Sequence, residues 1–234
     1  MRITTNTKQI QRRAKLGTYA SLGGIAILGA GMFASFRPNL MWLSLLALVA
    51  GFVLAQYGNY NLRRYGRTPR PDQVLADSMK GFDDRYHLYA WLLPAQFVLL
   101  SPQGLYTFLT RDQTGQISNT GAQWRSKFSL GRALLVFSQE GLGNPSQEAQ
   151  AAAGKLTDWV REKLPEVNVT AQPIVVFIDP RVQLELTDPA VPVLDPKGMK
   201  KWLRGAGKGE TIKPADLRKL EALFDETAAS KLQA

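Results

Sequence analysis

The chain of 234 residues contains no cysteine and only one histidine, His87. The missing cysteine excludes disulfides, thiolate metal sites and a cysteine nucleophile, and it is in keeping with a reducing cytoplasmic environment. The single histidine argues against a histidine-dependent catalytic triad, because no serine stands at a spacing that suggests a pair with it. We expect His87 to be a half-exposed residue of a strand.

Acidic residues are also missing from the first 71 residues. Ten cations lie there, and beyond them the remaining Lys and Arg equal the 19 Asp and Glu in number, so the formal net charge of +10 belongs entirely to the N-terminal part. Cations confined to the flanks of apolar segments are typical of a membrane protein rather than of a nucleic-acid-binding surface. The ten are Arg2, Lys8, Arg12, Arg13, Lys15, Arg37, Arg63, Arg64, Arg67 and Arg70.

Two stretches without any charge, residues 17–36 and 39–58, lie between these cations. Each has about 20 residues, which lets a helix rising about 1.5 Å per residue cross a hydrocarbon core of about 30 Å. Only a tip around Arg37 separates them, so the sequence predicts an antiparallel transmembrane hairpin. A cleaved signal peptide is the alternative for the first stretch, but the stretch is long for that role and a second one follows almost at once.

The cations also predict an orientation. They flank the hairpin on both sides, whereas Arg37 is alone at its tip. The positive-inside rule therefore predicts an integral membrane protein with both termini in the cytoplasm. We expect small residues at four-residue spacing to let the helices pack closely on one another or on a partner subunit. These rows are Ala26, Ala30 and Ala34 in the first helix and Ala47, Gly51 and Ala55 in the second.

Four parts follow from this pattern. They are a basic N-terminal segment (1–16), the transmembrane hairpin (17–58), a juxtamembrane linker (59–72) and a domain (73–234). The linker is polar and contains two prolines, and we expect its cations to lie on anionic lipid headgroups. Those cations are Arg63, Arg64, Arg67 and Arg70.

Strand-like and helix-like segments alternate along the domain, which predicts an α/β fold with a mixed sheet. Asn144 and Pro145 are a favourable N-cap and first residue for the longest helix. Asp179 and Asp195, each followed by proline, are expected to form strand-ending turns. We expect strands at residues 85–91, 97–101, 105–110, 133–137, 174–178 and 191–194, and helices at 71–80, 144–164, 197–204 and 214–228.

One run of the domain, residues 97–117, reads FVLLSPQGLYTFLTRDQTGQI, and Trp124 and an Asn144-Pro145-x-Gln147 helix start come after it. In order and spacing these motifs resemble the nuclease-related domain (NERD) family, over roughly residues 73–193. That family is similar to the PD-(D/E)xK, restriction-endonuclease-like nucleases. The resemblance therefore implies a restriction-endonuclease-like mixed-sheet domain after the hairpin.

The resemblance also implies where a nuclease would bind its metal. The family pattern places an Asp just before the Phe97 strand and a Glu-x-Lys at the end of the next one, where two carboxylates bind a divalent cation and the lysine stabilises charge. This chain has Gln96, Leu109 and Arg111 at those positions. An amide is a poor Mg²⁺ ligand and leucine is none, so we predict no metal, no cofactor and no catalytic residue. Acids for a migrated site would have to come from Asp83, Asp84 and Asp112.

The domain contains one basic cluster, opposed only by Glu210. It is a candidate contact for nucleic acid, acidic lipid or an acidic partner, and the alternative is a solvated helix face. Because the domain as a whole is neutral, we expect any nucleic-acid binding to be weak. The cluster consists of Lys197, Lys200, Lys201, Arg204, Lys208 and Lys213.

These features predict a membrane-anchored, catalytically degenerate nuclease-related domain that binds or scaffolds at the cytoplasmic face. Two alternatives stay open. The first is a metal-dependent nuclease with a rearranged site, for which acids would have to converge around Arg111. The second is an accessory subunit of a larger membrane protein complex, with the hairpin as the interacting element.

Overall fold

The computed structural model describes residues 1–127, 141–205 and 211–233. The chain forms two units. One is an α/β unit made of Met1–Asn6, Pro71–Phe128 and Gly141–Ala234, and the other is a helical unit that includes Thr7–Arg70. The strand expected at residues 133–137 lies outside the described residues.

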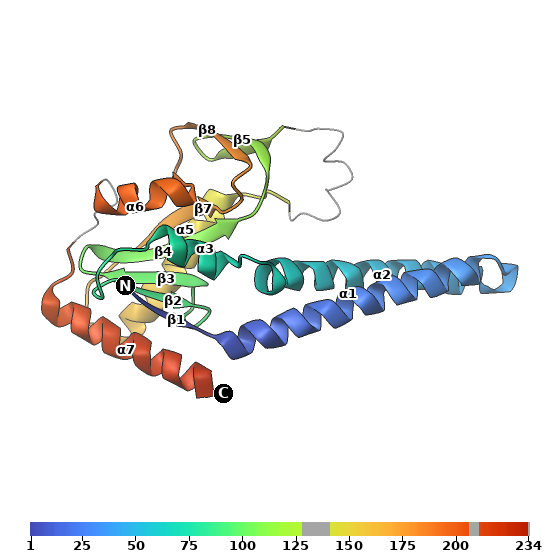
Figure 1. Ribbon diagram of the computed structural model, residues 1–234, viewed down its shortest axis with the longest axis horizontal. Helices are drawn as coiled ribbons and strands as arrows, with labels where there is room; N and C mark the ends of the chain where they lie inside the picture. The colour runs from blue at the N-terminus through green and yellow to red at the C-terminus, as the bar shows by residue number, and fades with distance from the viewer. Residues whose placement is uncertain (128–140, 206–210, 234) are drawn as a thin grey trace. The chain divides into compact units, whose positions relative to one another are not determined.

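A six-stranded mixed sheet in the order β1-β2-β3-β4-β7-β9 forms the centre of the α/β unit (Figure 1). β2, β3 and β4 are antiparallel neighbours, whereas β1 runs parallel to β2, and β7 runs parallel to both β4 and β9. This confirms the predicted α/β class with a mixed sheet. The strands are β1 (Arg2–Thr5), β2 (His87–Ala90), β3 (Phe97–Ser101), β4 (Gly104–Arg111), β7 (Ala171–Phe177) and β9 (Val193–Leu194).

A second, three-stranded sheet has the order β6-β5-β8. β5 follows β4 along the chain and β8 follows β7, so the parallel pairing of β4 with β7 is repeated between β5 and β8. The sequence analysis missed all three strands, because β5 and β6 are mostly polar. Their bounds are β5 (Gly115–Thr120), β6 (Gln123–Ser126) and β8 (Val182–Thr187).

Helices cover both faces of the six-stranded sheet. α5 (Pro145–Lys163) and α7 (Pro214–Gln233) share an apolar core with residues of β2, β3 and β4. On the other face, α6 (Pro196–Arg204) places Trp202 against Tyr106 of β4, and it contacts α3 (Pro71–Ser78) through Ser78 and Met199. A layered sheet of this kind buries both of its faces, which explains why every residue of β2 and β3 is buried.

The helix starts follow the predicted capping chemistry. Asn144 accepts a hydrogen bond from Gln147 N at 3.1 Å, and Asp195 accepts one from Gly198 N at 2.8 Å, each just before a proline. These bonds satisfy backbone donors that have no partner inside the first turn of a helix. The turn role expected for Asp195 is thereby confirmed as an N-cap.

The N-terminus differs from its predicted role as a separate basic segment. Met1–Asn6 belongs to the α/β unit, and its backbone pairs with β2 through Arg2 N to Tyr86 O at 2.9 Å and Asn6 N to Ala90 O at 3.2 Å. The predicted domain boundary at residue 73 is corrected accordingly. The helical segment is an insertion between β1 and α3, so the chain leaves the α/β unit and returns to the same unit.

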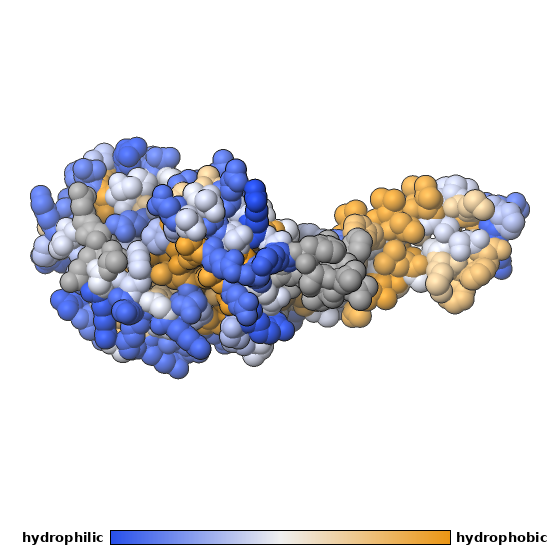
Figure 2. Space-filling view, turned by 90° about the horizontal axis from the view of Figure 1, so that it is seen from above, coloured by the Kyte–Doolittle hydropathy of each residue, from blue (hydrophilic) through white to orange (hydrophobic). Residues whose placement is uncertain are grey.

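The helical unit contains α1 (Thr7–Ser35), a short 3-10 helix η1 (Pro38–Leu40), α2 (Met41–Asn61) and a π-helical turn η2 (Leu62–Gly66). Two of its helices are long and apolar enough to cross a membrane. Large side chains of both are exposed to a degree unusual for a core helix of a soluble protein, as for Phe33 at 72% and Leu45 at 69%. Figure 2 shows hydrophobic residues over much of the hairpin surface.

Glycines bring the two helices together. A Cβ atom on Gly24 would lie 2.6 Å from the backbone nitrogen of Ala55, and one on Gly31 would lie 2.7 Å from the Cβ of Ala47. Ala26 and Ala30 are exposed, so they do not pack on α2 as one of the two predicted alternatives required, whereas Ala47, Gly51 and Ala55 of the second row do face α1. The buried glycines are Gly17, Gly24 and Gly31 in α1 and Gly51 and Gly58 in α2.

We expect Gly24→Leu to separate the two helices, because no side chain fits against the Ala55 backbone. The native sequence has no cysteine, so a pair introduced as Gly23→Cys and Leu54→Cys gives a clean readout. A Cβ on Gly23 is 3.5 Å from Leu54 Cδ2, and oxidation should cross-link this pair in the parent chain but not after Gly24→Leu. Gly29→Leu is the matched control, since its Cβ meets nothing within 4 Å. Equal cross-linking in both variants would contradict the glycine interface.

Candidate functional site

The three positions that the sequence resemblance assigns to nuclease ligands lie at one edge of the six-stranded sheet. Leu109 and Arg111 are alternate residues at the C-terminal end of β4, so their side chains point to the same face. Val98 of β3 pairs with Thr107 of β4, and continuing this antiparallel register places Gln96 opposite Leu109. The fold therefore brings together the positions that the sequence resemblance singled out.

Leu109 is partly buried and packs against the apolar interior at this edge. It packs on a cluster that contains Ala149 of α5, Val175 and Phe177 of β7 and Ile117 of β5. A carboxylate at position 109 would lose part of its hydration among these apolar side chains, which is unfavourable. The leucine thus contributes to the core at the position where the family pattern has a metal ligand.

Arg111 is buried, with 4% of its side chain exposed, and its Nη2 lies 2.5 Å from Oε1 of Glu148. Glu148 is in the first turn of α5, where the helix dipole also favours a negative charge. Because the arginine of this pair is buried and the glutamate is half-exposed, we expect loss of the carboxylate to cost more than the roughly 0–1 kcal/mol of a fully exposed pair. Sequence reasoning missed Glu148, although its place just after the Asn144 cap marked it as a first-turn acid.

A second acid at this edge is also bound by an arginine. Asp179 follows β7 and is 2% exposed. Its two carboxylate oxygens accept hydrogen bonds from Nε and Nη2 of Arg181 at 3.0 and 2.9 Å, and the Arg181 backbone nitrogen donates to it as well. The turn role expected for Asp179 is confirmed. Glu148 and Asp179 therefore each have a guanidinium partner, which competes directly with a metal ion for the same oxygens.

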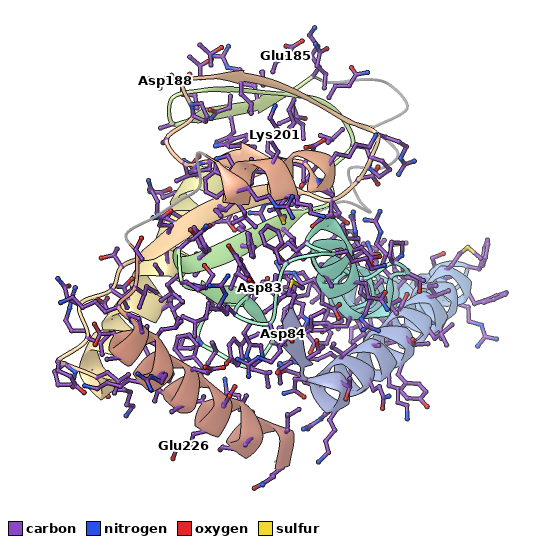
Figure 3. All side chains as sticks on the ribbon, turned by 60° about the vertical axis from the view of Figure 1, so that its left-hand side comes forward. Asp83, Asp84, Glu185, Asp188, Lys201 and Glu226 are labelled. Carbon is purple, nitrogen blue, oxygen red and sulfur yellow. The ribbon has the colours of Figure 1, made fainter. Side chains whose placement is uncertain are left out.

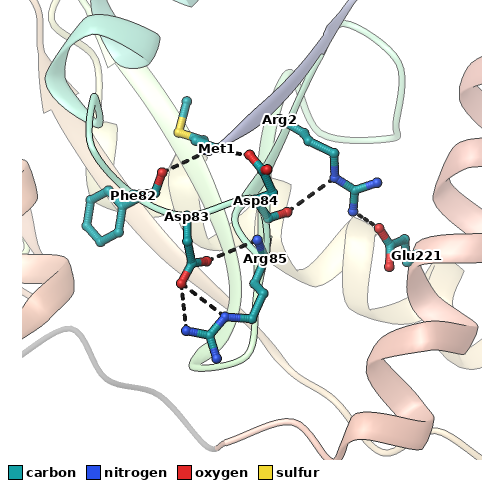
Figure 4. Close-up of polar contacts among 7 residues, drawn as sticks. All are labelled: Met1, Arg2, Phe82, Asp83, Asp84, Arg85 and Glu221. Carbon is teal, nitrogen blue, oxygen red and sulfur yellow. Dashed lines mark hydrogen bonds and ion pairs between the residues drawn. The ribbon is translucent and has the colours of Figure 1, made fainter.

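Of the three acids proposed for a migrated site, Asp83 and Asp84 lie away from Arg111. Asp83 accepts two hydrogen bonds from the Arg85 side chain, and the hydrogen bond from Arg85 holds the pKa of the Asp83 carboxyl below its usual range (Figure 4). Asp84 pairs with the amino group of Met1 at 3.0 Å. Both precede β2, which runs parallel to β4, so they are at the opposite end of the sheet from Arg111. Asp112 follows Arg111 directly and is half-buried.

The cations of the predicted basic cluster have different neighbours. Lys197 borders a pocket of about 350 Å³ beside Asp179 and Asp195, whereas Lys213 borders a separate pocket with Glu166 and Asp216. Lys200 donates to the Lys80 carbonyl oxygen at 2.5 Å, and the Arg204 guanidinium lies 5.3 Å from the Phe82 ring centre. Lys201 is exposed on α6 (Figure 3), and Lys208 lies outside the described residues.

The cations next to the hairpin lie at one end of the helical unit. Arg63 and Arg64 are in η2, at the end of α2, and the Arg64 guanidinium lies 4.5 Å from the Tyr60 ring centre. Lys8, Arg12, Arg13 and Lys15 are in the first turns of α1. A Cβ on Gly17 would lie 3.0 Å from the Asn61 Cβ, so the start of α1 and the end of α2 are adjacent.

The expectation of a half-exposed His87 is wrong. His87 is 5% exposed, on the face of β2 that is covered by α7. Its ring is stacked on that of Tyr89, with centres 3.9 Å apart. Alternation along a four-residue strand could not reveal this burial, because the helix that covers the residue comes more than 130 positions later.

Comparisons of the chain with protein-family models, with curated proteins and with solved structures found no match.

Proposed function

We propose that the chain is a membrane-anchored binding or scaffolding module whose α/β unit resembles a nuclease but has lost the groups that would hold the catalytic metal. The observation that carries this proposal is the edge formed by Gln96, Leu109 and Arg111. Leu109 packs against the core there, and the buried Arg111 forms an ion pair with the half-exposed Glu148. An amide, an alkyl group and a paired guanidinium offer a divalent cation no anionic ligand.

The membrane part of the proposal rests on the helical unit. Its exposed side chains are apolar along two helices, and water would be a poor solvent for such a surface. The cations at the open end of the hairpin suit anionic headgroups on the cytoplasmic side, where each contributes about 1 kcal/mol when it is near the surface. Orientation with both termini in the cytoplasm follows from the same cations by the positive-inside rule.

The two alternative functions differ from this proposal in what they require. A nuclease with a rearranged site would need acids without an arginine partner near Arg111, yet Glu148 and Asp179 are both paired with arginines. An accessory subunit would use the outward faces of the hairpin, where Ala26 and Ala30 are exposed. Purification in mild detergent with a stoichiometric membrane partner would favour the accessory subunit.

A nuclease assay tests the loss of chemistry. We expect the purified full-length chain to cleave neither single- nor double-stranded nucleic acid in Mg²⁺ or Mn²⁺, and Arg111→Ala to change no hydrolytic rate. The combined change of Gln96→Asp, Leu109→Glu and Arg111→Lys restores the residue types that the family pattern has at these three positions. Circular dichroism then verifies that the fold tolerates Leu109→Glu, which places a carboxylate against the core.

The informative control is removal of divalent metal ions with a chelator. Cleavage by the parent chain that disappears with EDTA, and also with Glu148→Gln, Asp179→Asn or Asp112→Asn, would overturn the proposal in favour of a rearranged nuclease. Cleavage that persists through all of these changes would come from a contaminating enzyme.

A further inference from the structure

The fold brings the only histidine of the chain to two carboxylates of α7. His87 of β2, Glu221 and Asp225 each offer one ligand atom, and these atoms all lie within 4.8 Å of one another. Glu221 and Asp225 are four residues apart in α7, so they occupy one face of the helix about one turn apart. Nothing in the resemblance to nucleases involves these residues, which lie at the face of the sheet that α7 covers.

The imidazole is oriented toward the carboxylates. Its Nε2 lies 2.8 Å from the Thr4 hydroxyl oxygen, which fixes one ring nitrogen. The other nitrogen, Nδ1, is buried without a hydrogen-bond partner among the described residues, and it lies 3.8 Å from Oδ1 of Asp225. A buried nitrogen lone pair without a donor is costly, and metal coordination is one way to satisfy it.

The surroundings of the cluster match those of metal ligands in proteins. A ligating histidine usually has its second nitrogen held by a polar group, as Thr4 holds Nε2 here. Asp225 is held too, since the Tyr89 hydroxyl donates to its Oδ1 at 2.7 Å.

Arg2 is the group that competes with a cation for this cluster. It forms an ion pair with Glu221 (Figure 4), and its side chain is 45% exposed. An exposed guanidinium can rotate into water at small cost, because surface ion pairs contribute only about 0–1 kcal/mol. Arg2 thus neutralises Glu221, and a divalent ion bound to the cluster would have to displace it.

We propose that His87, Glu221 and Asp225 form a binding site for a divalent transition-metal ion, of which Zn²⁺ is the best match to one imidazole and two carboxylates. Zinc takes nitrogen and oxygen ligands at about 2.0–2.2 Å, and sites with three protein ligands keep a further position for water. The three ligand atoms lie within 4.8 Å of one another and would have to move closer together to reach such distances. The ion would join β1 and β2 to α7.

The single histidine allows a direct test by nuclear magnetic resonance. The full-length chain, purified without a histidine tag in detergent and labelled with ¹⁵N-histidine, gives one imidazole spin system. Zn²⁺ alone is titrated, with Mg²⁺ as the comparison. We expect Zn²⁺ to shift the Nδ1 resonance strongly and to raise the thermal midpoint, and Mg²⁺ to do neither. Absence of an Nδ1 shift at saturating Zn²⁺ would overturn the proposal.

Variants separate coordination from a merely structural ion-pair cluster. We expect Asp225→Asn and His87→Ala to weaken Zn²⁺ binding more than tenfold, and Thr4→Val to weaken it about tenfold through loss of the Nε2 partner. Arg2→Gln should tighten binding several-fold, which a structural role for Arg2 does not predict. The control is Glu226→Gln, an exposed acid next to Asp225 (Figure 3), which should leave the affinity unchanged. Zn²⁺ affinity that is insensitive to Asp225→Asn, or weakened by Arg2→Gln, would count against the site.

Discussion

A cysteine placed at the hairpin tip is expected to react with a membrane-impermeant maleimide in intact cells, whereas one placed near the C-terminus is expected to react only after lysis. Asn39→Cys and Ser230→Cys serve this purpose, because both positions are exposed and the native chain has no cysteine. Two physical reasons support the result. The cations lie at both flanks of the hairpin, and the chain on both sides of the hairpin belongs to one folded unit.

The second reason is independent of charge. Strand β1 precedes the hairpin and pairs in parallel with β2, which follows it, over the register from Arg2–His87 to Thr5–Ala90. A chain that crossed the membrane once between these strands could not form this pairing. Ser230→Cys labelled from outside in intact cells would overturn the orientation, and Asn39→Cys protected from the reagent in intact cells but labelled after lysis would mean that the hairpin does not cross. Fusion of a reporter after Ala234 should give the same answer, with activity in the cytoplasm.

Removal of the hairpin is expected to produce a soluble, folded α/β unit, provided that β1 is kept. In the variant, residues 7–70 are replaced by about ten Gly and Ser residues, whose typical end-to-end distance is about 17 Å. β1 keeps its backbone bonds to β2, Asp84 keeps the Met1 amino group and Glu221 keeps Arg2. We expect a monomeric protein with a cooperative thermal transition.

The matched comparison is a chain that starts at Gln73. It lacks β1, so it exposes the edge of β2, whose four residues are all buried in the full structure. An unpaired apolar edge promotes aggregation, and we expect this chain to be largely insoluble. Equal solubility and equal thermal midpoints for the two chains would show that β1 contributes little, and would support the simpler boundary at residue 73 that the sequence predicts.

The sequence determined the features that depend on composition and on short-range chemistry. Two uncharged stretches bounded by cations predict apolar helices of membrane length, because the required length is a count of residues. The helix starts at Pro145 and Pro196 follow from a cap and a proline in adjacent positions. The resemblance to nucleases assigns Gln96 and Leu109 to positions where that family has carboxylates, and this assignment stays a prediction.

The tertiary structure decided which residues meet across long separations. The local sequence pattern does not predict that β1 pairs with β2, that Glu148 contacts Arg111 or that His87 contacts Asp225. Each of these contacts depends on the course of the whole chain. The helix interface shows the same limit. Small residues occur on several sides of α1, and only the packing of α2 selects the side with Gly24 over the side with Ala26. A periodic pattern gives the faces of an element, and only the fold determines which neighbour covers each face.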